Sequence, residues 1–404
     1  MTDTPPAQDR YAGLGASYYW FFILFMVALS MFGSFVNDMY IPALPEMTRY
    51  FHTDASTCQL GLSFGMIGLA IGQIVFGPVS DKYGRKGILN AGMLIFIAGG
   101  TASVFATGIH FFICCRLVQG IGASTGYFLA RTMPADITYG RTLAKTMALI
   151  GAINGIAPAS APVLGGLLTH WLGWRSIFVC LTLMAALMLL INTKLKETLP
   201  SERRYRQSLW KAFEGYRSLI VKSRFIVHVL LKGAALGLLF AYIASAPFIM
   251  QTHFGYSDVA FGLFMGGNAL FVAAGSMIAL KFRMLKKAGV YGSWGVGMAV
   301  AAQVCALYMA DSFWLYEILN CLMLFCLGLI FTMSNTLAMN EGREDAGRAS
   351  AILGVMGYAF GAAATPLTGL GDILHSTALV YAGVTVFVIV FSLLSRRIPP
   401  ELKD

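Results

Sequence analysis

The stretch that decides the fold lies between two apolar runs, at residues 77–89, and reads Gly77-Pro-Val-Ser-Asp81-Lys-Tyr-Gly84-Arg85-Lys86-Gly87-Ile-Leu89. Because an apolar run of about 20 residues precedes it and another follows, we expect a tight turn at a membrane surface. Few turns at such a surface need an acid, glycines and three basic residues in so short a space. The stretch therefore indicates charged groups with a purpose beyond joining two helices.

The composition excludes a soluble protein. Hydrophobic residues make up 57% of the 404 residues and charged residues only 12%, whereas a soluble domain carries about 25% charged residues. Lipid leaves each backbone segment to satisfy its own hydrogen bonds, which favours helices over open strands. We therefore predict an all-α integral membrane protein with twelve transmembrane helices, at residues 18–41, 58–77, 87–107, 110–132, 144–169, 174–193, 226–250, 259–280, 289–310, 313–337, 348–370 and 376–395.

The net charge of +10 follows membrane topology and is not the footprint of a nucleic acid. Nine basic residues lie between Lys194 and Arg224, and others gather in alternate loops, whereas the remaining loops hold only Arg49 and Arg175. This asymmetry is the positive-inside signal and predicts that both termini lie in the cytoplasm. The seven cysteines lie in predicted spans without zinc-ligand spacing, so we predict no metal site.

The longest polar stretch divides the predicted spans into six and six. We therefore predict an N-terminal six-helix bundle at residues 1–193, a cytoplasmic linker at 194–225 and a C-terminal six-helix bundle at 226–404. Two similar bundles of this kind face each other across a central site. In the linker, apolar residues from Leu209 to Ile220 recur at helical spacing among basic ones. This pattern predicts an amphipathic helix on the inner leaflet, and a disordered basic tether is the alternative.

The most informative single residue is Asp38, a carboxylate near the end of the first apolar run, followed by Pro42 and Pro45. A charge inside a membrane costs about 2.5–3.5 kcal/mol or more and is functional by default, and the prolines predict a broken helix end that lines a cavity. Arg116 has a similar predicted depth in the fourth span. We predict that Arg116 stabilises the Asp38 anion and that the two form a proton switch. An interfacial aspartate and a structural arginine are the alternatives.

Residues 77–89 resemble the G-x-x-x-D-x-x-G-R-K signature that the major facilitator superfamily carries between its second and third transmembrane helices. The resemblance implies the fold of that superfamily and a latch on the cytoplasmic side, formed by Gly77, Asp81, Gly84 and Arg85. We expect Arg131, at the cytoplasmic end of the fourth span, to be the partner of this latch. A charge cluster that only sets topology is the alternative, although it would not require Asp81.

The first span is similar to that of the bicyclomycin-resistance type of drug:proton antiporter, where Asn-Asp-Met or Thr-Asp-Met-Tyr leads into two prolines. Here the string is Asn37-Asp38-Met39-Tyr40, and the resemblance implies proton and drug coupling at the aspartate. Arg116-Leu-Val-Gln119-Gly120-Ile-Gly122 resembles the R-x-x-Q-G-x-G motif of the superfamily.

The fifth span resembles the glycine-rich motif of antiporters in this superfamily through Gly151, Gly155, Pro162, Gly165 and Gly166, with an alanine before the proline. Generic packing of helices through small residues is the alternative. Residues 174–178, 241–248 and 346–351 also resemble the drug-efflux branch, so the resemblance covers essentially the whole chain.

We therefore predict a multidrug efflux protein of the bacterial inner membrane that exports small amphipathic drugs in exchange for protons by alternating access. We expect a monomer in lipid that needs no cofactor because the proton gradient drives it, and the single acid favours neutral substrates. We do not expect an enzyme, since the six histidines are scattered and no nucleotide-binding loop is present. An exporter or symporter of one metabolite, a membrane enzyme and a structural or sensor protein are the alternatives.

We expect the substrate pocket between the halves, near the middle of the bilayer. Its expected lining is polar or aromatic and comes from the central spans: Asn37, Tyr40, Gln119, Tyr127, Asn154, Phe240, Tyr242 and Asn268. Of the two remaining charges, we expect Lys232 to extend towards the membrane surface and Glu317 to be interfacial.

Overall fold

The computed structural model describes residues 16–138, 140–205, 216–309 and 312–397, and all regular structure within these ranges is helical. The first group of helices comprises α1 (Ala16–Asp38), η1 (Ile41–Ala43), α2 (Leu44–Tyr50), α3 (Ala55–Tyr83), α4 (Arg85–Val104), α5 (Ile109–Ile137), α6 (Gly140–Leu172) and α7 (Arg175–Thr193). After η2 (Ser201–Arg203), the second group comprises α9 (Ser223–Pro247), η3 (Phe248–His253), α10 (Asp258–Ala279), α11 (Leu285–Met309), α12 (Phe313–Glu341), η4 (Arg343–Asp345), α13 (Ala346–Ala364), η5 (Pro366–Gly369) and α14 (Ile373–Arg397).

Every apolar segment predicted from the sequence coincides with a long helix, but only ten helices in the described ranges are long and apolar enough to cross a membrane. The other two are α5 and α6. α5 carries Arg116, Arg131 and Asp136 and packs against α1, α3 and α4. A helix enclosed by other helices does not need the uniform apolarity that lipid imposes, so its polar residues lower its hydropathy without exposing charge to lipid.

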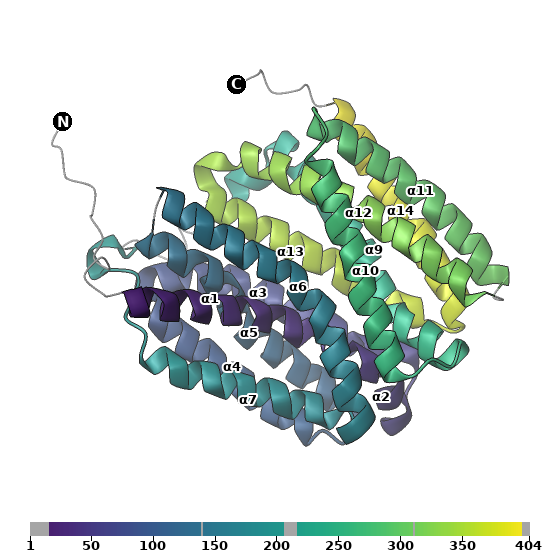
Figure 1. Ribbon diagram of the computed structural model, residues 1–404, viewed down its shortest axis with the longest axis horizontal. Helices are drawn as coiled ribbons and strands as arrows, with labels where there is room; N and C mark the ends of the chain where they lie inside the picture. The colour runs from purple at the N-terminus through teal and green to yellow at the C-terminus, as the bar shows by residue number, and fades with distance from the viewer. Residues whose placement is uncertain (1–15, 139, 206–215, 310–311, 398–404) are drawn as a thin grey trace.

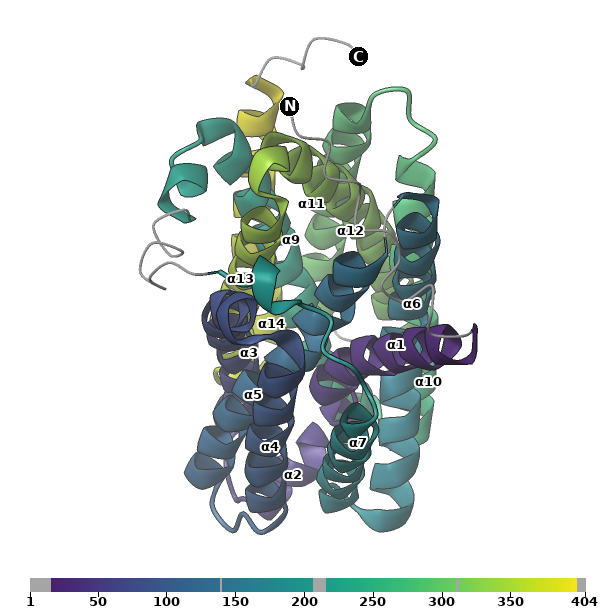
Figure 2. The same ribbon diagram turned by 90° about the vertical axis from the view of Figure 1, so that its left-hand side faces the viewer.

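The two groups of helices lie side by side, with α1 to α7 at the lower left of Figure 1 and α9 to α14 at the upper right. Contacts between the groups run mainly through α6 with α10 and α3 with α13. The linker joins α7 to α9 at one end of the molecule, which we call the linker end. The opposite, distal end holds α2, which lies at the bottom of Figure 2, while the last turn of α14 lies at the top.

The first helix is broken where the prolines predict it. α1 stops at Asp38, Tyr40 has φ −96° and ψ 0°, and a short 3-10 turn with Pro42 leads into α2 with Pro45 in its first turn. Proline lacks a backbone donor and cannot continue a helix in this register. The expected bent end is therefore confirmed, and Asp38 lies at the break.

The expected tight turn over residues 77–89 is wrong in its extent. α3 continues to Tyr83 and α4 begins at Arg85, so only Gly84 interrupts the helices. Its φ of +102° is a backbone conformation that residues other than glycine rarely adopt. A Cβ on Gly84 would also lie 2.6 Å from a carboxylate oxygen of Glu197, which leaves room only for glycine.

The linker helix is seen only in its last turn. Residues 216–220 are helical, whereas Leu209, Trp210 and Phe213 lie outside the described residues. Leu219 is buried against Phe225 of α9 and residues of α12 and α13, rather than facing a lipid leaflet. The end of the linker therefore packs on the second group of helices.

The distal end is sealed by hydrogen bonds from side chains to backbone carbonyls and by a close approach of helix backbones, all between the two groups. The Gln251 side chain donates to the Pro42 carbonyl at 2.9 Å, and Ser56 donates to the Pro366 carbonyl at 2.7 Å. A Cβ on Gly262 of α10 would lie 2.6 Å from the Pro162 carbonyl oxygen of α6. Glycine thus allows the two helices to approach at backbone distance.

We predict that Gly262→Ala opens the distal end. The added methyl group meets backbone that cannot move aside without separating α6 from α10, so we expect closure to weaken by about 1–3 kcal/mol. Spin labels at positions 49 and 252, in a background without the native cysteines, should report longer distances. Gly267→Ala on the same helix is the matched control, because a Cβ there meets nothing within 4 Å. Equal distances in the two variants would contradict the prediction.

Candidate functional site

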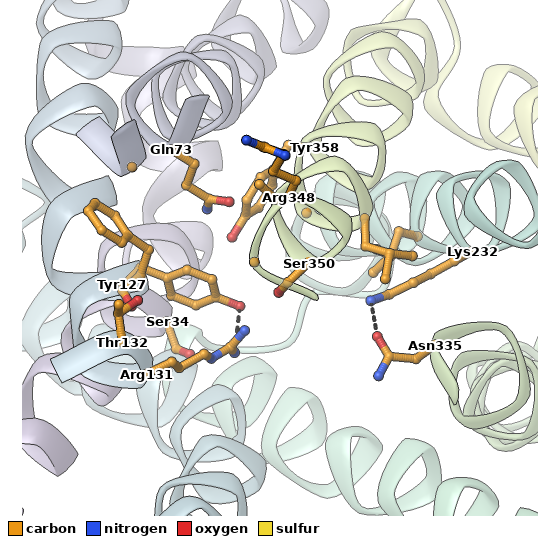
Figure 3. Close-up of a pocket in the computed structure, with 18 of the residues that line it drawn as sticks. Ser34, Gln73, Tyr127, Arg131, Thr132, Lys232, Asn335, Arg348, Ser350 and Tyr358 are labelled. Atoms are coloured by element: carbon orange, nitrogen blue, oxygen red, sulfur yellow. Dashed lines mark hydrogen bonds between the residues drawn. The ribbon is translucent and has the colours of Figure 1, made fainter. Parts of the chain in front are cut away.

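A cavity of about 880 Å³ lies between the two groups of helices. Its lining comes from α1, α3, α5 and α6 on one side and from α9, α12 and α13 on the other. The cavity extends from Asp38 to the linker residues Tyr205 and Tyr216, whereas the distal end is sealed by the contacts described above. Figure 3 shows the part in which polar side chains from both groups converge. The cavity is therefore reached from the linker end.

Asp38 lies at the end of α1 and lines this cavity together with Asn37. The Asp38 side chain is half-buried, and among the described residues it has neither a hydrogen-bond donor nor a cation within ion-pair distance. The side-chain oxygen of Asn37 is buried and also has no hydrogen-bond partner in the described chain. The carboxyl group is thus available to a proton or to a bound molecule.

The expected pair of Asp38 with Arg116 is not formed in this structure. Arg116 is fully buried and donates to the Val36 carbonyl at 3.1 Å and to the Gln119 side chain at 2.8 Å. Its guanidinium lies over the Tyr40 ring, with 4.3 Å from the central carbon to the ring centroid. The last carbonyls of a helix lack partners within the helix, and Arg116 satisfies one of them. The structure thus shows that Arg116 holds the C-terminal end of α1 through this hydrogen bond. A role of Arg116 in proton coupling stays a prediction.

Three of the expected pocket residues line the cavity, namely Asn37, Tyr127 and Phe240. Four others are buried within a helix group instead: Tyr40, Gln119, Tyr242 and Asn268. Periodicity places a residue in the middle of a span, but the rotation of the helix decides which neighbour it faces. The side chain of Asn154 lies outside the described residues, as do Gly151 and Gly155 beside it.

Glu317 was expected at the membrane interface, and the structure contradicts this. Only 5% of the residue is exposed, and its Oε1 accepts a hydrogen bond of 2.8 Å from Asn268. Asn268 also donates to the Tyr242 hydroxyl at 2.7 Å. Tyr242 and Asn268 therefore belong to a polar cluster inside the second group, and this cluster explains their absence from the cavity.

The charged motif after α3 forms a compact network within the first group. Arg85 donates to Asp81 at 2.5 Å and to Asp136 at 3.0 Å, and the side chain of Asp136 is only 12% exposed. The Glu197 carboxylate accepts from the backbone N–H of Arg85 at 2.9 Å and of Lys86 at 3.2 Å. These are the free donors at the start of α4, where a negative charge is favourable. Asp136 and Glu197 were not expected, because both lie far from the motif in sequence.

Arg131, the expected partner of this motif, pairs elsewhere. Its guanidinium donates to the Tyr127 hydroxyl at 3.1 Å and lies over the same ring at 4.6 Å. Tyr127 is one turn earlier on α5, and both side chains face the cavity in Figure 3. Gly77, which lines the cavity, has open space where a Cβ would lie. The latch role of these residues stays a prediction.

The glycine pair of α6 has a defined contact in the structure. A Cβ on Gly165 would clash with the Met39 carbonyl beside the α1 break, and one on Gly166 would clash with the Asp258 carbonyl of α10. The expected motif therefore lets α6 approach both the broken end of α1 and the second group of helices. Pro162 of the same motif contacts Gly262 of α10 through its carbonyl.

Several cavity residues were not identified from the sequence, notably Gln73, Asn335 and Tyr358. The Gln73 amide nitrogen is buried without a partner in the described chain. Lys232 does not extend to the surface but donates to Asn335 at 2.7 Å across the cavity wall. The sequence signal that could have identified these cavity residues is a polar residue inside an apolar run, since such residues usually face the interior of a bundle.

Known proteins are similar to this chain over most of its length. The sequence pattern of the Major Facilitator Superfamily matches residues 20–366. An uncharacterised MFS-type transporter of Bacillus subtilis, YdgK, is 32% identical over 381 residues, which are 91% of each chain. The multidrug resistance protein MdtL of Vibrio parahaemolyticus is 26% identical over 342 residues, 83% of this chain and 85% of that protein. Among solved structures, a D-xylose-proton symporter superposes with a TM-score of 0.73 at 15% identity, covering 95% and 98% of the two chains.

We predict that Arg85→Ala destabilises the fold. The substitution leaves the mostly buried carboxylate of Asp136 without its cation, so the free energy of unfolding should fall by about 1.5–3 kcal/mol. Denaturant unfolding of the purified protein in detergent measures this change. Lys82→Ala is the control from the same motif, because Lys82 contacts only the ring of Tyr83, at 5.7 Å, among the interactions seen in the described chain. Equal stability of the two variants would contradict the proposed network.

Proposed function

The chain belongs to the Major Facilitator Superfamily and is a membrane transporter rather than an enzyme, and from this premise we propose that it exports small amphipathic compounds in exchange for protons. All twelve long helices span the inner membrane of a bacterium in this proposal, with both termini and the linker in the cytoplasm. The cavity then faces the cytoplasm, and the structure corresponds to an inward-facing state. The transporter works as a monomer and needs no cofactor, since the proton gradient supplies the energy.

The observation that carries the proposal is the position of Asp38. An acid inside a membrane protein is costly and marks a pathway for protons or ligands. Asp38 lines a large space that both groups of helices share. Among the described residues, no cation lies within ion-pair distance of it. A proton and a bound compound can therefore compete for the same carboxyl group, which is the requirement for exchange.

The two ends of the molecule allow the cavity to open to one side of the membrane at a time. The distal seal rests on backbone contacts such as Gly262 against Pro162, which can separate as whole helices tilt. At the linker end, the motif around Arg85 holds α3, α5 and the start of the linker together as one unit. Closing this end brings that unit against α13, so that the cavity opens on the opposite side.

The available energy suits a compound without net charge. Exchange of one proton for one neutral molecule gains about 2.3 kcal/mol per 100 mV of membrane potential. It gains about 1.4 kcal/mol more per pH unit. A compound with one positive charge moves no net charge in the exchange and uses only the pH difference.

Transport of one specific metabolite is the second candidate function. The large apolar part of the lining, which includes Leu236, Leu239, Phe240 and Phe331, favours amphipathic compounds over small hydrophilic ones. The names of relatives such as MdtL point in the same direction. A narrow substrate range in a transport assay would favour the metabolite carrier.

We predict that drug addition releases protons from inside-out vesicles with an acidic lumen, and that Asp38→Asn abolishes this release. Asparagine keeps the size of the side chain but cannot carry a proton, so exchange stops. A pH-sensitive dye in the lumen, with chloramphenicol as a neutral compound and ethidium as a cation, measures the response.

Asp54→Asn is the matched control, since Asp54 lies outside the cavity and caps α3 by accepting from the Thr57 backbone N–H at 2.8 Å. Asparagine is an equally good helix cap, so this variant should respond like the native protein. A full response from Asp38→Asn would place the proton site elsewhere. The absence of a response to any drug in the native protein would favour the metabolite carrier.

A further inference from the structure

The charges of the cavity do not balance. Seven charged side chains line it: Asp38, Asp81, Arg85, Arg131, Lys232, Asp345 and Arg348. Two ion pairs account for four of them, Arg85 with Asp81 at 2.5 Å and Arg348 with Asp345 at 2.9 Å. Within the described chain, the other three have no partner of opposite charge within 4 Å. The Asp38 carboxylate and the cations of Arg131 and Lys232 thus remain available to a molecule in the cavity.

The two cations without an acidic partner come from opposite groups of helices. Arg131 projects from α5 and Lys232 from α9, and Figure 3 shows both extending into the cavity from opposite sides. Their hydrogen-bond partners are neutral, the Tyr127 hydroxyl at 3.1 Å and the Asn335 amide oxygen at 2.7 Å. Arg131 and Lys232 are both cations that extend into the same cavity, so their like charges repel each other. An anionic group between them would replace this repulsion with two charge-assisted hydrogen bonds.

The surrounding lining offers both polar and apolar contacts. In Figure 3 the Ser350 side chain lies between Arg131 and Lys232, and Tyr358 of the same helix, α13, faces the cavity farther from Lys232. The side chains of Leu236, Ile243 and Phe331 add an apolar wall. A pocket with a few polar groups and an apolar wall is typical of sites for amphipathic molecules.

We propose that the transported compound is an amphipathic zwitterion. Its acidic group, such as a carboxylate, bridges Arg131 and Lys232, its ammonium group lies at Asp38, and its aromatic or alkyl body lies against the apolar wall. This inference rests on the proposed function, because it takes the cavity as the transport site and Asp38 as the group that exchanges its proton.

The arrangement explains how exchange and closure are linked. The ammonium group and a proton compete for the Asp38 carboxyl group, so the compound leaves when the proton arrives. The acidic group removes the repulsion between Arg131 and Lys232, so the two groups of helices can approach each other only when the site is loaded. A zwitterion has no net charge, so its exchange for one proton uses the full membrane potential.

Four probes with one scaffold test the proposal by direct binding. They are 4-phenyl-phenylalanine, its methyl ester, its N-acetyl derivative and the N-acetyl methyl ester, which carry both charges, only the cation, only the anion and neither. Calorimetry on the purified full-length protein at pH 6.0, where the weakly basic amine of the ester is also protonated, gives the affinities. We expect the free amino acid to bind about tenfold or more tightly than each singly blocked probe, since each lost group breaks a charge-assisted contact.

The variants Arg131→Gln and Lys232→Gln should weaken the free amino acid and the N-acetyl probe about tenfold while leaving the methyl ester unchanged. Arg131→Lys keeps the positive charge and should retain most of the affinity. Lys281→Gln, which removes an exposed charge outside the cavity, is the control. A variant that weakens all four probes equally indicates damaged structure, in which case the probe series in the native protein decides.

Equal affinity of the methyl ester and the free amino acid would overturn the proposal. So would a failure of the free amino acid to bind, whether or not the other probes bind. Because this measurement needs no proton gradient, its outcome is independent of the vesicle experiment. Proton release by neutral or cationic drugs, without binding of the zwitterion, would leave the proposed function standing and remove this inference alone.

Discussion

The hydrogen bond from Arg116 to the Val36 carbonyl, 3.1 Å long, is the contact on which the cavity depends. α1 ends two residues later at Asp38, and its last carbonyls have no partners within the helix. Lipid offers none either, and a positive charge at a helix C-terminus is favourable. Arg116 supplies both the donor and the charge, so the broken end is held in place while Asp38 faces the cavity.

The two ends of the molecule are built from different interactions. The distal end closes through helix backbones that touch where glycines remove the side chain, as between Gly262 and Pro162. The linker end carries ion pairs, such as Arg85 with Asp136, and each pair joins residues of one group of helices. Opening the distal end breaks a few hydrogen bonds between neutral groups, such as that from Gln251 to the Pro42 carbonyl, whereas a buried ion pair is more costly to break. The distal end is thus suited to opening, whereas the ion pairs of the linker end stay intact while the helices move.

Polar groups inside the bundle follow two patterns. In the interior of the second group, Glu317, Asn268 and Tyr242 bond to one another and have no contact with the cavity. At the cavity, Arg131 and Lys232 have only neutral partners among the described residues. A cluster with internal partners holds helices together, while a charge without a counterion is stabilised only when a ligand or water reaches it. This contrast separates structural polarity from polarity that serves binding.

The sequence by itself determined where the helices lie, that α1 breaks after Asp38, and which residues carry charge inside apolar runs. Spacing along the chain specifies these features, because hydropathy and proline act locally. Only the tertiary structure decided that Arg116 clamps a carbonyl rather than Asp38, that Glu317 is buried, and that Lys232 faces Arg131. The partner of a side chain depends on how far each helix is rotated about its axis and which helix lies beside it, and no local pattern encodes either quantity.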